Sequence, residues 1–392
     1  MFEKVSSIIR DPSVLDYDYV PDYLVGRDSQ MASLELLFRP FAEYTRSCTA
    51  MLTGPVGTGK TATARFFCAR MAEYCTSHGR PLDTLLVNCR NRNSDAAVTL
   101  AMARHFDKGF PDRGFSSDEM FRSFRNRMRE SGRSLVIILD EVDVLLKRGS
   151  VDIIYQITRL SEEIRDRGHT VSLIMISQES VVDMLDEASL STFRRSNSVV
   201  FERYTRDELR EIVGRRAELA ILPGRISDDA LDMIADNSEE YGDARMAIEL
   251  LDRASNIAEG DTAGEINPEH VRSARAMVYS AVSESKLAAL DINRKIVLLA
   301  VARAMKTNRA IPSSVAEKTY AVVCEEYGVP ARKHTQFGLY VQDIEKTGAI
   351  RTLVKNGQNG RTTMISLPDI PSKVLAAKME DLLEKAIPGG AA

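Results

Sequence analysis

The stretch LTGPVGTGKTAT, residues 52–63, constrains the fold of this chain more than any other part of its sequence. It fits the pattern G-x-x-x-x-G-K-[ST] of a P-loop, a turn whose backbone N–H groups bind phosphate oxygens. The residues before it are typical of a strand and those after it of a helix, so the phosphates would lie at a helix N-terminus. Lys60 is placed to reach the β- and γ-phosphates, and the Thr61 hydroxyl to bind Mg²⁺. The loop residues expected to bind the nucleotide are Gly54, Gly57, Thr58, Gly59, Lys60 and Thr61.

Two carboxylates end a second apolar segment, LVIILDEVD, at residues 135–143. Asp140 and Glu141 would lie at the C-terminal tip of a buried strand, which is where α/β sheets bind ligands. We expect Asp140 to hold Mg²⁺ through water and Glu141 to polarise the attacking water as general base. An acidic loop without a catalytic role is the alternative. Beside the P-loop, the pair predicts binding and hydrolysis of ATP to ADP.

Three apolar runs in the first half of the chain predict a parallel sheet. Residues 84–89, 134–143 and 171–177 are almost continuously apolar, as parallel strands buried on both faces are. Amphipathic helical patterns separate these runs, which is the alternation of a doubly wound α/β domain. We therefore predict an α/β P-loop core over residues 1–204.

The character of the chain changes after the core. From Thr205 onward helical patterns follow one another without a strand, with caps expected at Thr205 and Ser227 and a further candidate cap at Gly242. These patterns predict an all-helical lid over residues 205–283. Residues 284–392 show three helices followed by a turn-rich hairpin, which is the pattern of a winged helix.

The third helix of this C-terminal unit is the candidate recognition helix. Its apolar residues Phe337, Tyr340, Val341 and Ile344 recur at helical spacing and should pack inward. The start of such a helix meets base edges or phosphates, and a wing can reach an adjacent groove. Winged helices also mediate protein contacts, which is the alternative. The residues expected to contact DNA are Lys333, His334, Thr335, Gln336, Lys355 and Arg361.

The distribution of charge supports a polyanion at that end. The whole chain has a net charge of −4, but residues 286–392 contain 16 Lys and Arg against 10 Asp and Glu, a net of +6. The first 285 residues therefore carry −10. A basic segment on an acidic body suggests nucleic-acid binding, although a solvated surface would have the same composition.

Composition limits where the chain works. No run of 18 apolar residues is present, so no membrane-spanning helix is expected. The five cysteines are scattered without a C-x-x-C pair, which argues against a disulfide framework or a zinc site. We expect a cytoplasmic, nucleoid-associated protein.

Several longer segments resemble one known family. YVPDYLVGR at residues 19–27, VVFERYTRDELREIVGRRAELA at 199–220 and EYGDARMAIELLDRASNIA at 240–258 are similar to motifs of archaeal origin-recognition initiators of the Orc/Cdc type, in the AAA+ superfamily. GFPDRGFSSDEMF, residues 109–121, resembles the helical insertion that contacts DNA in that family. The likeness runs over nearly the whole chain.

The resemblance implies further roles at the nucleotide. Gln178 follows the third apolar run and would position the lytic water, unless it only caps the strand. Arg245 would direct its guanidinium at the γ-phosphate, unless it is a surface residue on a helix that Asp243 caps. The residues implied to line the nucleotide pocket are Val20, Pro21, Arg27, Tyr204, Arg216 and Arg245.

The chain departs from the family pattern in three places. Gln178 is followed by Glu179 where the family usually has Asn and Asp, which puts efficient hydrolysis in doubt. Thr335 and Gln336 stand where two basic residues are frequent. Arg194 and Arg195 are candidates for an arginine finger that acts in trans, or an ordinary basic pair.

Taken together, these features predict an ATP-dependent replication initiator that binds double-stranded origin DNA. Hydrolysis would be slow and would act as a switch. The resemblance implies a replicative helicase of the minichromosome-maintenance type as partner, with paralogous initiators as further partners. A clamp-loader-like or remodelling ATPase and a nucleotide-gated transcription regulator are the alternatives. The DNA sequence recognised, the oligomeric state on DNA and the choice between activating and repressing origins are not encoded in any motif.

Overall fold

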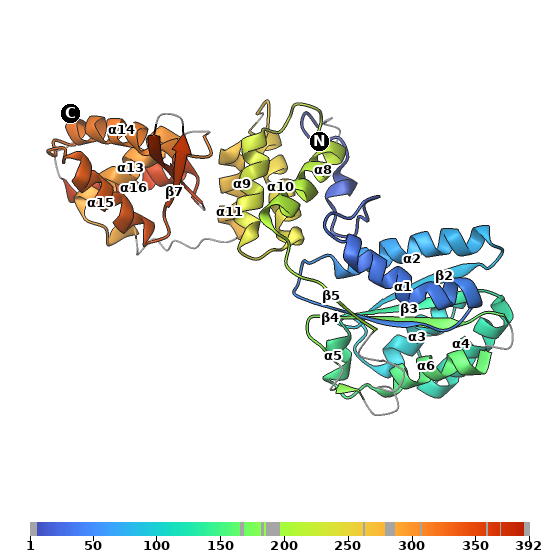
Figure 1. Ribbon diagram of the computed structural model, residues 1–392. Helices are drawn as coiled ribbons and strands as arrows, with labels where there is room; N and C mark the ends of the chain where they lie inside the picture. The colour runs from blue at the N-terminus through green and yellow to red at the C-terminus, as the bar shows by residue number, and fades with distance from the viewer. Residues whose placement is uncertain are drawn as a thin grey trace. The chain divides into compact units, whose positions relative to one another are not determined.

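A computed structural model describes residues 6–164, 168–181, 184–185, 197–261, 263–278, 287–305, 308–357, 360–368 and 370–387. Its contacts divide the chain into two compact units (Figure 1). The core unit contains Asp18–Glu208 and Tyr241–Ala244. The arm unit contains Met1–Tyr17, Leu209–Glu240 and Arg245–Ala392, so the lid and the C-terminal residues share one unit. The predicted domain boundaries at residues 204 and 283 stay predictions.

The core unit is built on a five-stranded parallel sheet with the strand order β2-β3-β4-β1-β5. Strands β3 and β4 are buried at every residue, which confirms the interpretation of their apolar runs. The β2–β3 register pairs Asn88 with Asp140, so the carboxyl ends of these strands lie side by side. The strands are β1 (Thr49–Thr53), β2 (Leu82–Asn88), β3 (Ser134–Asp140), β4 (Val171–Ser177) and β5 (Ser198–Val200).

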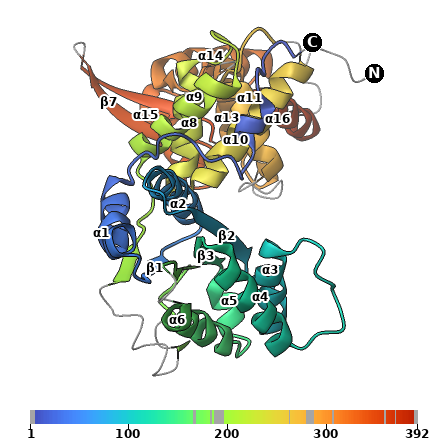
Figure 2. The same ribbon diagram turned by 90° about the vertical axis from the view of Figure 1, so that its right-hand side faces the viewer.

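Helices cover both faces of this sheet (Figures 1 and 2). Helices α1 and α2 pack on one face through an apolar cluster that includes Phe38 and Phe67. The other helices cover the opposite face through a second cluster around Phe124. The helices are α1 (Asp28–Tyr44), α2 (Lys60–Ser77), α3 (Asp95–Phe106), α4 (Ser117–Ser131), α5 (Val142–Leu146) and α6 (Asp152–Ile164). The predicted α/β class is correct.

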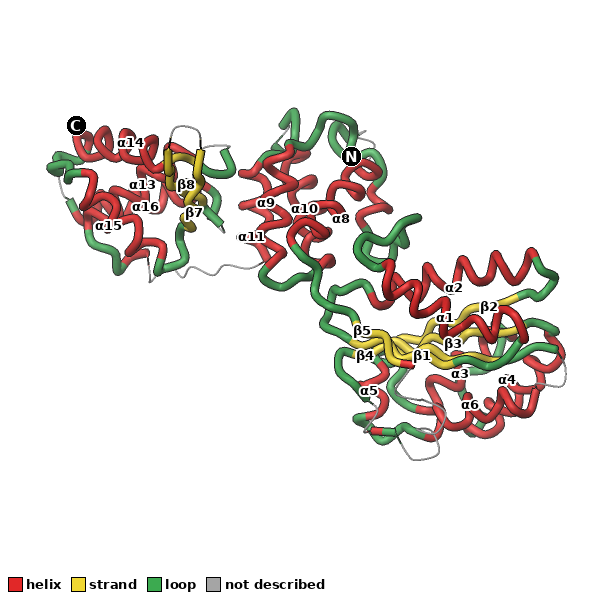
Figure 3. Tube along the Cα trace, viewed as in Figure 1, coloured by secondary structure: helices red, strands yellow, loops and turns green. Residues whose placement is uncertain are grey.

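The lid is helical, as predicted; Figure 3 shows it as red helices joined by green loops. The Ser227 hydroxyl accepts a hydrogen bond from the Ala230 amide at the start of α9. Thr205 and Glu208 form a reciprocal cap at the start of α8, so the caps expected at Ser227 and Thr205 are present. The N-terminal 3₁₀ turn, Pro12–Leu15, also belongs to the arm unit. The helices are α8 (Arg206–Ala220), α9 (Asp228–Glu239), α10 (Ala244–Gly260) and α11 (Pro268–Val278).

The C-terminal residues form the winged helix. Its antiparallel sheet has the order β6-β8-β7 and packs beside four helices. The last helix and the two-residue strand β6 were not predicted from the sequence. The elements are α13 (Ile292–Met305), β6 (Ile311–Pro312), α14 (Ser313–Glu326), α15 (His334–Glu345), β7 (Arg351–Gly357), β8 (Gly360–Ser366) and α16 (Ser372–Ala386).

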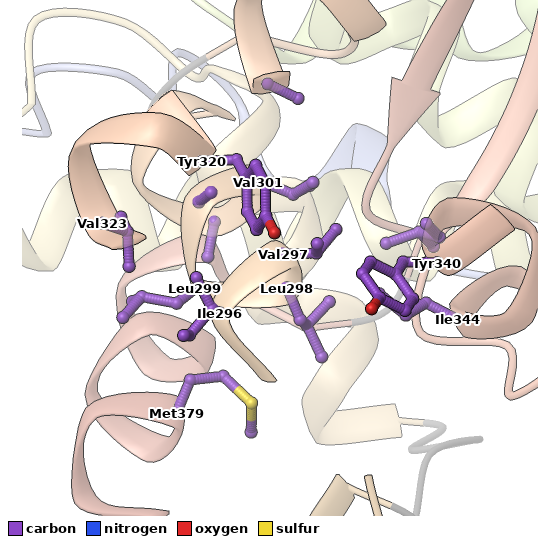
Figure 4. Packing of buried hydrophobic residues seen from close by; sticks show 14 of the residues in the cluster. Ile296, Val297, Leu298, Leu299, Val301, Tyr320, Val323, Tyr340, Ile344 and Met379 are labelled. Atoms are coloured by element: carbon purple, nitrogen blue, oxygen red, sulfur yellow. The ribbon is translucent and has the colours of Figure 1, made fainter. Parts of the chain in front are cut away.

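Helix α13 is the centre of the winged-helix core. Figure 4 shows its apolar side chains between Tyr320 of α14, Tyr340 and Ile344 of α15, and Met379 of α16. All four residues of α15 that were expected to face inward are buried. Within the described ranges, every helix is too short or too polar to cross a bilayer.

Truncation of this core should destabilise the winged helix. Ile344 is fully buried, so we expect Ile344→Ala to lower the free energy of unfolding by about 2–5 kcal/mol. Leu339 lies on the same helix at 48% exposure, and Leu339→Ala should change it by no more than about 0.5 kcal/mol. Hydrogen exchange of the α15 amides in the full chain measures both. Equal effects would contradict the packing described here.

Candidate nucleotide-binding site

The P-loop joins β1 to α2 in a turn that only glycine adopts easily. Gly54, Gly57 and Gly59 have φ angles of 148°, 75° and 83°. Gly59 supplies no side-chain cap to α2, so the first amides of that helix point into the loop. The Lys60 ammonium lies in the turn and donates to the carbonyls of Gly54 and Pro55 at 2.7 and 2.6 Å. Backbone amides at a helix N-terminus beside a lysine ammonium are donors that can bind phosphate.

The two residues predicted to serve Mg²⁺ are in direct contact. The Thr61 hydroxyl donates to one carboxylate oxygen of Asp140 at 2.8 Å, and the other oxygen accepts from the Glu141 amide at 3.0 Å. Asp140 is buried at the tip of β3. A hydroxyl and a carboxylate at this spacing fit a hard cation that also keeps water and phosphate oxygens as ligands. Among the described residues, no cluster of three or more His, Cys, Asp or Glu side chains could hold a metal ion by itself.

Glu141 has an unusual backbone and two polar neighbours. Its φ and ψ of 55° and 42° are left-handed, a conformation that costs a non-glycine residue free energy and is frequent at functional sites. Its carboxylate accepts from Arg90 Nε at 2.9 Å and from Asn88 Nδ2 at 3.5 Å. Neither residue was predicted from the sequence. Asn88 ends β2, beside β3, so the rule that identified Asp140 applied to it as well.

Arg27 contacts backbone carbonyls of the P-loop and of two neighbouring segments. It is 3% exposed and donates to the carbonyls of Thr58, Gly26 and Glu202 at 3.0, 2.7 and 3.0 Å. Its guanidinium also lies 3.7 Å from the ring centroid of Tyr204. Burial raises the pKa of Tyr204, an effect that Arg27 opposes. Arg27 and Tyr204 therefore support the loop from within the core unit, and their contact with nucleotide stays a prediction.

The segment that leads into α10 packs against the P-loop. The Ala244 amide donates to the Gly57 carbonyl at 3.1 Å, and the Tyr204 amide donates to the Gly242 carbonyl at 3.2 Å. A Cβ atom on Gly57 would lie 1.6 Å from an Asp243 carboxylate oxygen. The loop thus touches the residues that immediately precede Arg245.

The remaining predicted nucleotide residues are distributed over both units. Gln178 is exposed directly after β4, and Val20 and Pro21 are half-buried in the segment before α1. Arg216 is buried in the arm unit, where it donates to the carbonyl of Val14. Arg245 lies in the first turn of α10. Their proposed roles stay predictions. Arg194 and Arg195 lie outside the described residues.

The predicted DNA contacts begin helix α15. Lys333, His334 and Thr335 are exposed and Gln336 is half-buried. The imidazole Nδ1 of His334 lies 2.7 Å from Glu317. The wing consists of β7 and β8, and the side chains of Lys355 and Arg361 fall outside the part of the chain that the structure describes.

Family comparisons match all three parts of the chain. Residues 44–185 match an AAA domain, residues 210–276 a Cdc6 AAA+ ATPase-type lid domain, and residues 285–377 a CDC6 C-terminal winged helix domain. The chain is 31% identical to an ORC1-type DNA replication protein of Aeropyrum pernix over 92% of each chain. It is 28% identical to an ORC1-type DNA replication protein of Pyrococcus horikoshii over 95% of this chain and 91% of that protein.

Two solved structures agree with these matches. The fold is similar to Cdc6p from Pyrobaculum aerophilum, with a TM-score of 0.80 and 30% identity, over 97% of this chain and 100% of that one. It is also similar to the Aeropyrum pernix ORC1 protein in complex with DNA, with a TM-score of 0.64 and 29% identity, over 97% and 98%.

Two glycines with similar backbone φ angles allow the cost of backbone strain to be distinguished from the cost of a steric collision in the P-loop. Gly57 and Gly79 have φ angles of 75° and 71°, but a Cβ on Gly79 would meet no atom within 4 Å. Gly79→Ala should cost about 1–2 kcal/mol and leave nucleotide binding intact. Gly57→Ala should also collide with Asp243 and weaken binding of a fluorescent ATP analogue at least about tenfold, or about 1.4 kcal/mol. Asp243→Ala should partly restore it, and equal binding by the two alanine variants would contradict this assignment.

Proposed function

The chain belongs to the family of ORC1-type, Cdc6-like AAA+ DNA replication proteins, and we propose that it is an ATP-dependent initiator of DNA replication. In this proposal it binds double-stranded origin DNA and helps load a replicative helicase of the minichromosome-maintenance type. The observation that carries the proposal is the contact between the P-loop and the start of α10, in a chain that ends in a winged helix. This arrangement supports a link between the bound nucleotide and DNA.

The core residues have distinct proposed roles toward the nucleotide. Lys60 exchanges its carbonyl partners for phosphate oxygens, and the loop amides bind the remaining phosphate charge. Thr61 and Asp140 hold Mg²⁺, which neutralises charge on the phosphates. Glu141 orients water at the γ-phosphate and accepts its proton.

Slow hydrolysis is proposed on two observations. Glu141 is paired with Arg90, so its carboxylate must give up an ion pair before it can act on water. Gln178 is one methylene longer than the Asn that such a position commonly carries, which changes the placement of its amide. We propose that Arg245 reads the γ-phosphate and that ATP serves mainly as a state signal.

DNA binding is proposed for two surfaces. In the arm unit the exposed start of α15 supplies Lys333, His334 and Thr335, and the wing adds Lys355 and Arg361. In the core unit the segment before α4 presents Phe115, 47% exposed and 5.1 Å from the ring of Phe110. The similar ORC1 protein of Aeropyrum pernix was solved in complex with DNA, which supports this proposal. Paralogous initiators are the other proposed partners, at a nucleoid-associated site in the cytoplasm.

Glu141→Gln should separate ATP binding from hydrolysis. Because the amide cannot accept the proton of the water, we expect kcat to fall by about 10²–10⁴-fold with ATP affinity retained. Fluorescence anisotropy with candidate origin repeats should show specific binding that differs between ATP and ADP in the wild type. The variant should remain in the ATP-like state, and Glu35→Gln, an exposed residue of α1, should behave as wild type.

Weak binding that ignores sequence and collapses with salt would overturn the initiator proposal. It would favour a remodelling ATPase whose winged helix contacts protein.

Arg90→Ala should speed hydrolysis. An exposed ion pair contributes up to about 1 kcal/mol, so freeing Glu141 should raise kcat by no more than about fivefold and leave ATP affinity unchanged. Arg92→Ala, two residues away, is the matched control and should leave kcat unchanged. Steady-state phosphate release measures both, and a lower kcat in Arg90→Ala would show that Arg90 orients Glu141 productively.

A further inference from the structure

Helix α16 of the winged helix has its first amides satisfied by the lid. Its N-cap is Pro371, which provides no side-chain cap. The amides of Ser372 and Lys373 each donate to a carboxylate oxygen of Glu269, both at 3.2 Å. Glu269 lies in the first turn of α11, more than a hundred residues earlier in the chain. A carboxylate at a helix N-terminus satisfies both the unpaired amides and the positive end of the helix dipole.

Arg272 extends this contact to a second point. It lies one turn after Glu269 on α11, and its side chain is completely buried. It donates to the Glu269 carboxylate at 2.6 Å and to the backbone carbonyl of Asn308, in the segment between α13 and β6. A buried guanidinium is stable only where its N–H groups meet acceptors, so the relative positions of these groups are restricted.

Arg309 makes the third contact, with helix α9 of the lid. Its guanidinium donates to Asp232 at 2.7 Å and to Asp236, one turn further along α9. Asp232 also accepts from Arg210 of α8 at 3.0 Å. The two carboxylates, spaced i and i+4, form a fork that matches the planar guanidinium.

These contacts link two helices of the lid to two places in the winged helix. Glu269 and Arg272 of α11 contact the start of α16 and Asn308, while Asp232 and Asp236 of α9 contact Arg309. Helix α16 is itself anchored in the winged-helix core by Leu375, Met379 and Leu383 (Figure 4 shows Met379). The winged helix is thus held at two places, residues 308–309 and 372–373, by groups from two lid helices, and such a junction permits fewer orientations than a single ion pair would.

We propose that the lid and the winged helix form one rigid arm, locked by Glu269, Arg272 and Arg309, so that a lid movement carries helix α15 with it. The link to DNA rests on the function proposed above; the rigidity does not. The chain enters this arm at Arg245, directly after the Ala244 amide that the P-loop carbonyl binds. A change at the γ-phosphate would therefore reach the winged helix without a hinge inside the arm.

Electron spin resonance distance measurements on the full chain test the rigidity directly. All five native cysteines are buried, and burial raises the pKa of the Cys68 and Cys89 thiols to about 12, so introduced thiols should be labelled selectively. Leu219→Cys in α8 and Ala321→Cys in α14 place one exposed label in the lid and one in the winged helix. We expect a single narrow distance distribution that is the same with ADP and with a non-hydrolysable ATP analogue.

Charge-reversal variants test which contacts hold the lid and the winged helix in one orientation. Asp236→Arg and Arg309→Asp should each broaden the distribution, and the double variant should narrow it again. Asp229→Arg, an exposed residue on the same helix, is the matched control and should change nothing. A broad distribution in the wild type, a shift between nucleotides, or a narrow distribution in both single reversals would overturn the proposal.

The consequence for DNA is measured separately. If the arm is the link, Asp236→Arg should reduce the ratio of DNA affinities in ATP and ADP to about one, and the double reversal should restore it. Since the distance measurement uses neither DNA nor hydrolysis, a chain that fails to bind origin DNA would refute the proposed function and leave the rigidity test valid. A charge reversal that broadens the distance distribution and yet leaves the ratio of DNA affinities in ATP and ADP unchanged would contradict the proposed role of the arm in linking nucleotide to DNA.

Discussion

The hydrogen bond from the Ala244 amide to the Gly57 carbonyl is the interaction on which the functional organisation of this chain depends. Phosphate binding by backbone amides requires a loop with little side-chain bulk at its turning points. In this chain the same lack of bulk creates the space that Asp243 occupies against Gly57, and that the Tyr204 hydroxyl occupies against Gly59. The loop that would hold the nucleotide is therefore also the loop that contacts the start of α10.

Arginine side chains hold neighbouring segments together at three places in the described residues. Arg27 donates to three backbone carbonyls around the P-loop, Arg272 joins Glu269 to the carbonyl of Asn308, and Arg309 spans two aspartates. Backbone carbonyls and paired carboxylates accept from several directions, and a planar fork that stays charged matches them where Lys would supply a single point charge. Each of these arginines lies in a network, so Lys substitutions at these sites would not be conservative.

The parts of the fold that the sequence predicted are those with a local signal. The P-loop has a fixed spacing, and the runs over β3 and β4 are apolar at almost every position because both faces of the sheet are covered. The inward face of α15 followed from helical spacing alone. Some missed features had a local signal, such as Leu375, Met379 and Leu383 at helical spacing in α16, but the cap of that helix and the contact of Arg90 had none. Helix α16 begins without a local cap because Glu269 supplies one from α11, and Arg90 gains its importance from a contact with Glu141 across two strands. Both features depend on residues that are close in space but distant in sequence.

The polar character of the junction between lid and winged helix has a physical consequence. The apolar cluster of the winged helix, among the described residues, draws on Leu287 and later positions, so the lid contributes charges and hydrogen bonds to this junction. Such contacts are strong only at one geometry, and they weaken steeply when a partner moves, whereas apolar surfaces can slide. A ligand shifts an equilibrium only by its difference in affinity for the two states. In a rigid arm, a movement of the lid changes the position of α15 by the same rotation. A junction that slides would let α15 keep several orientations, so the difference in affinity would have less effect on DNA binding.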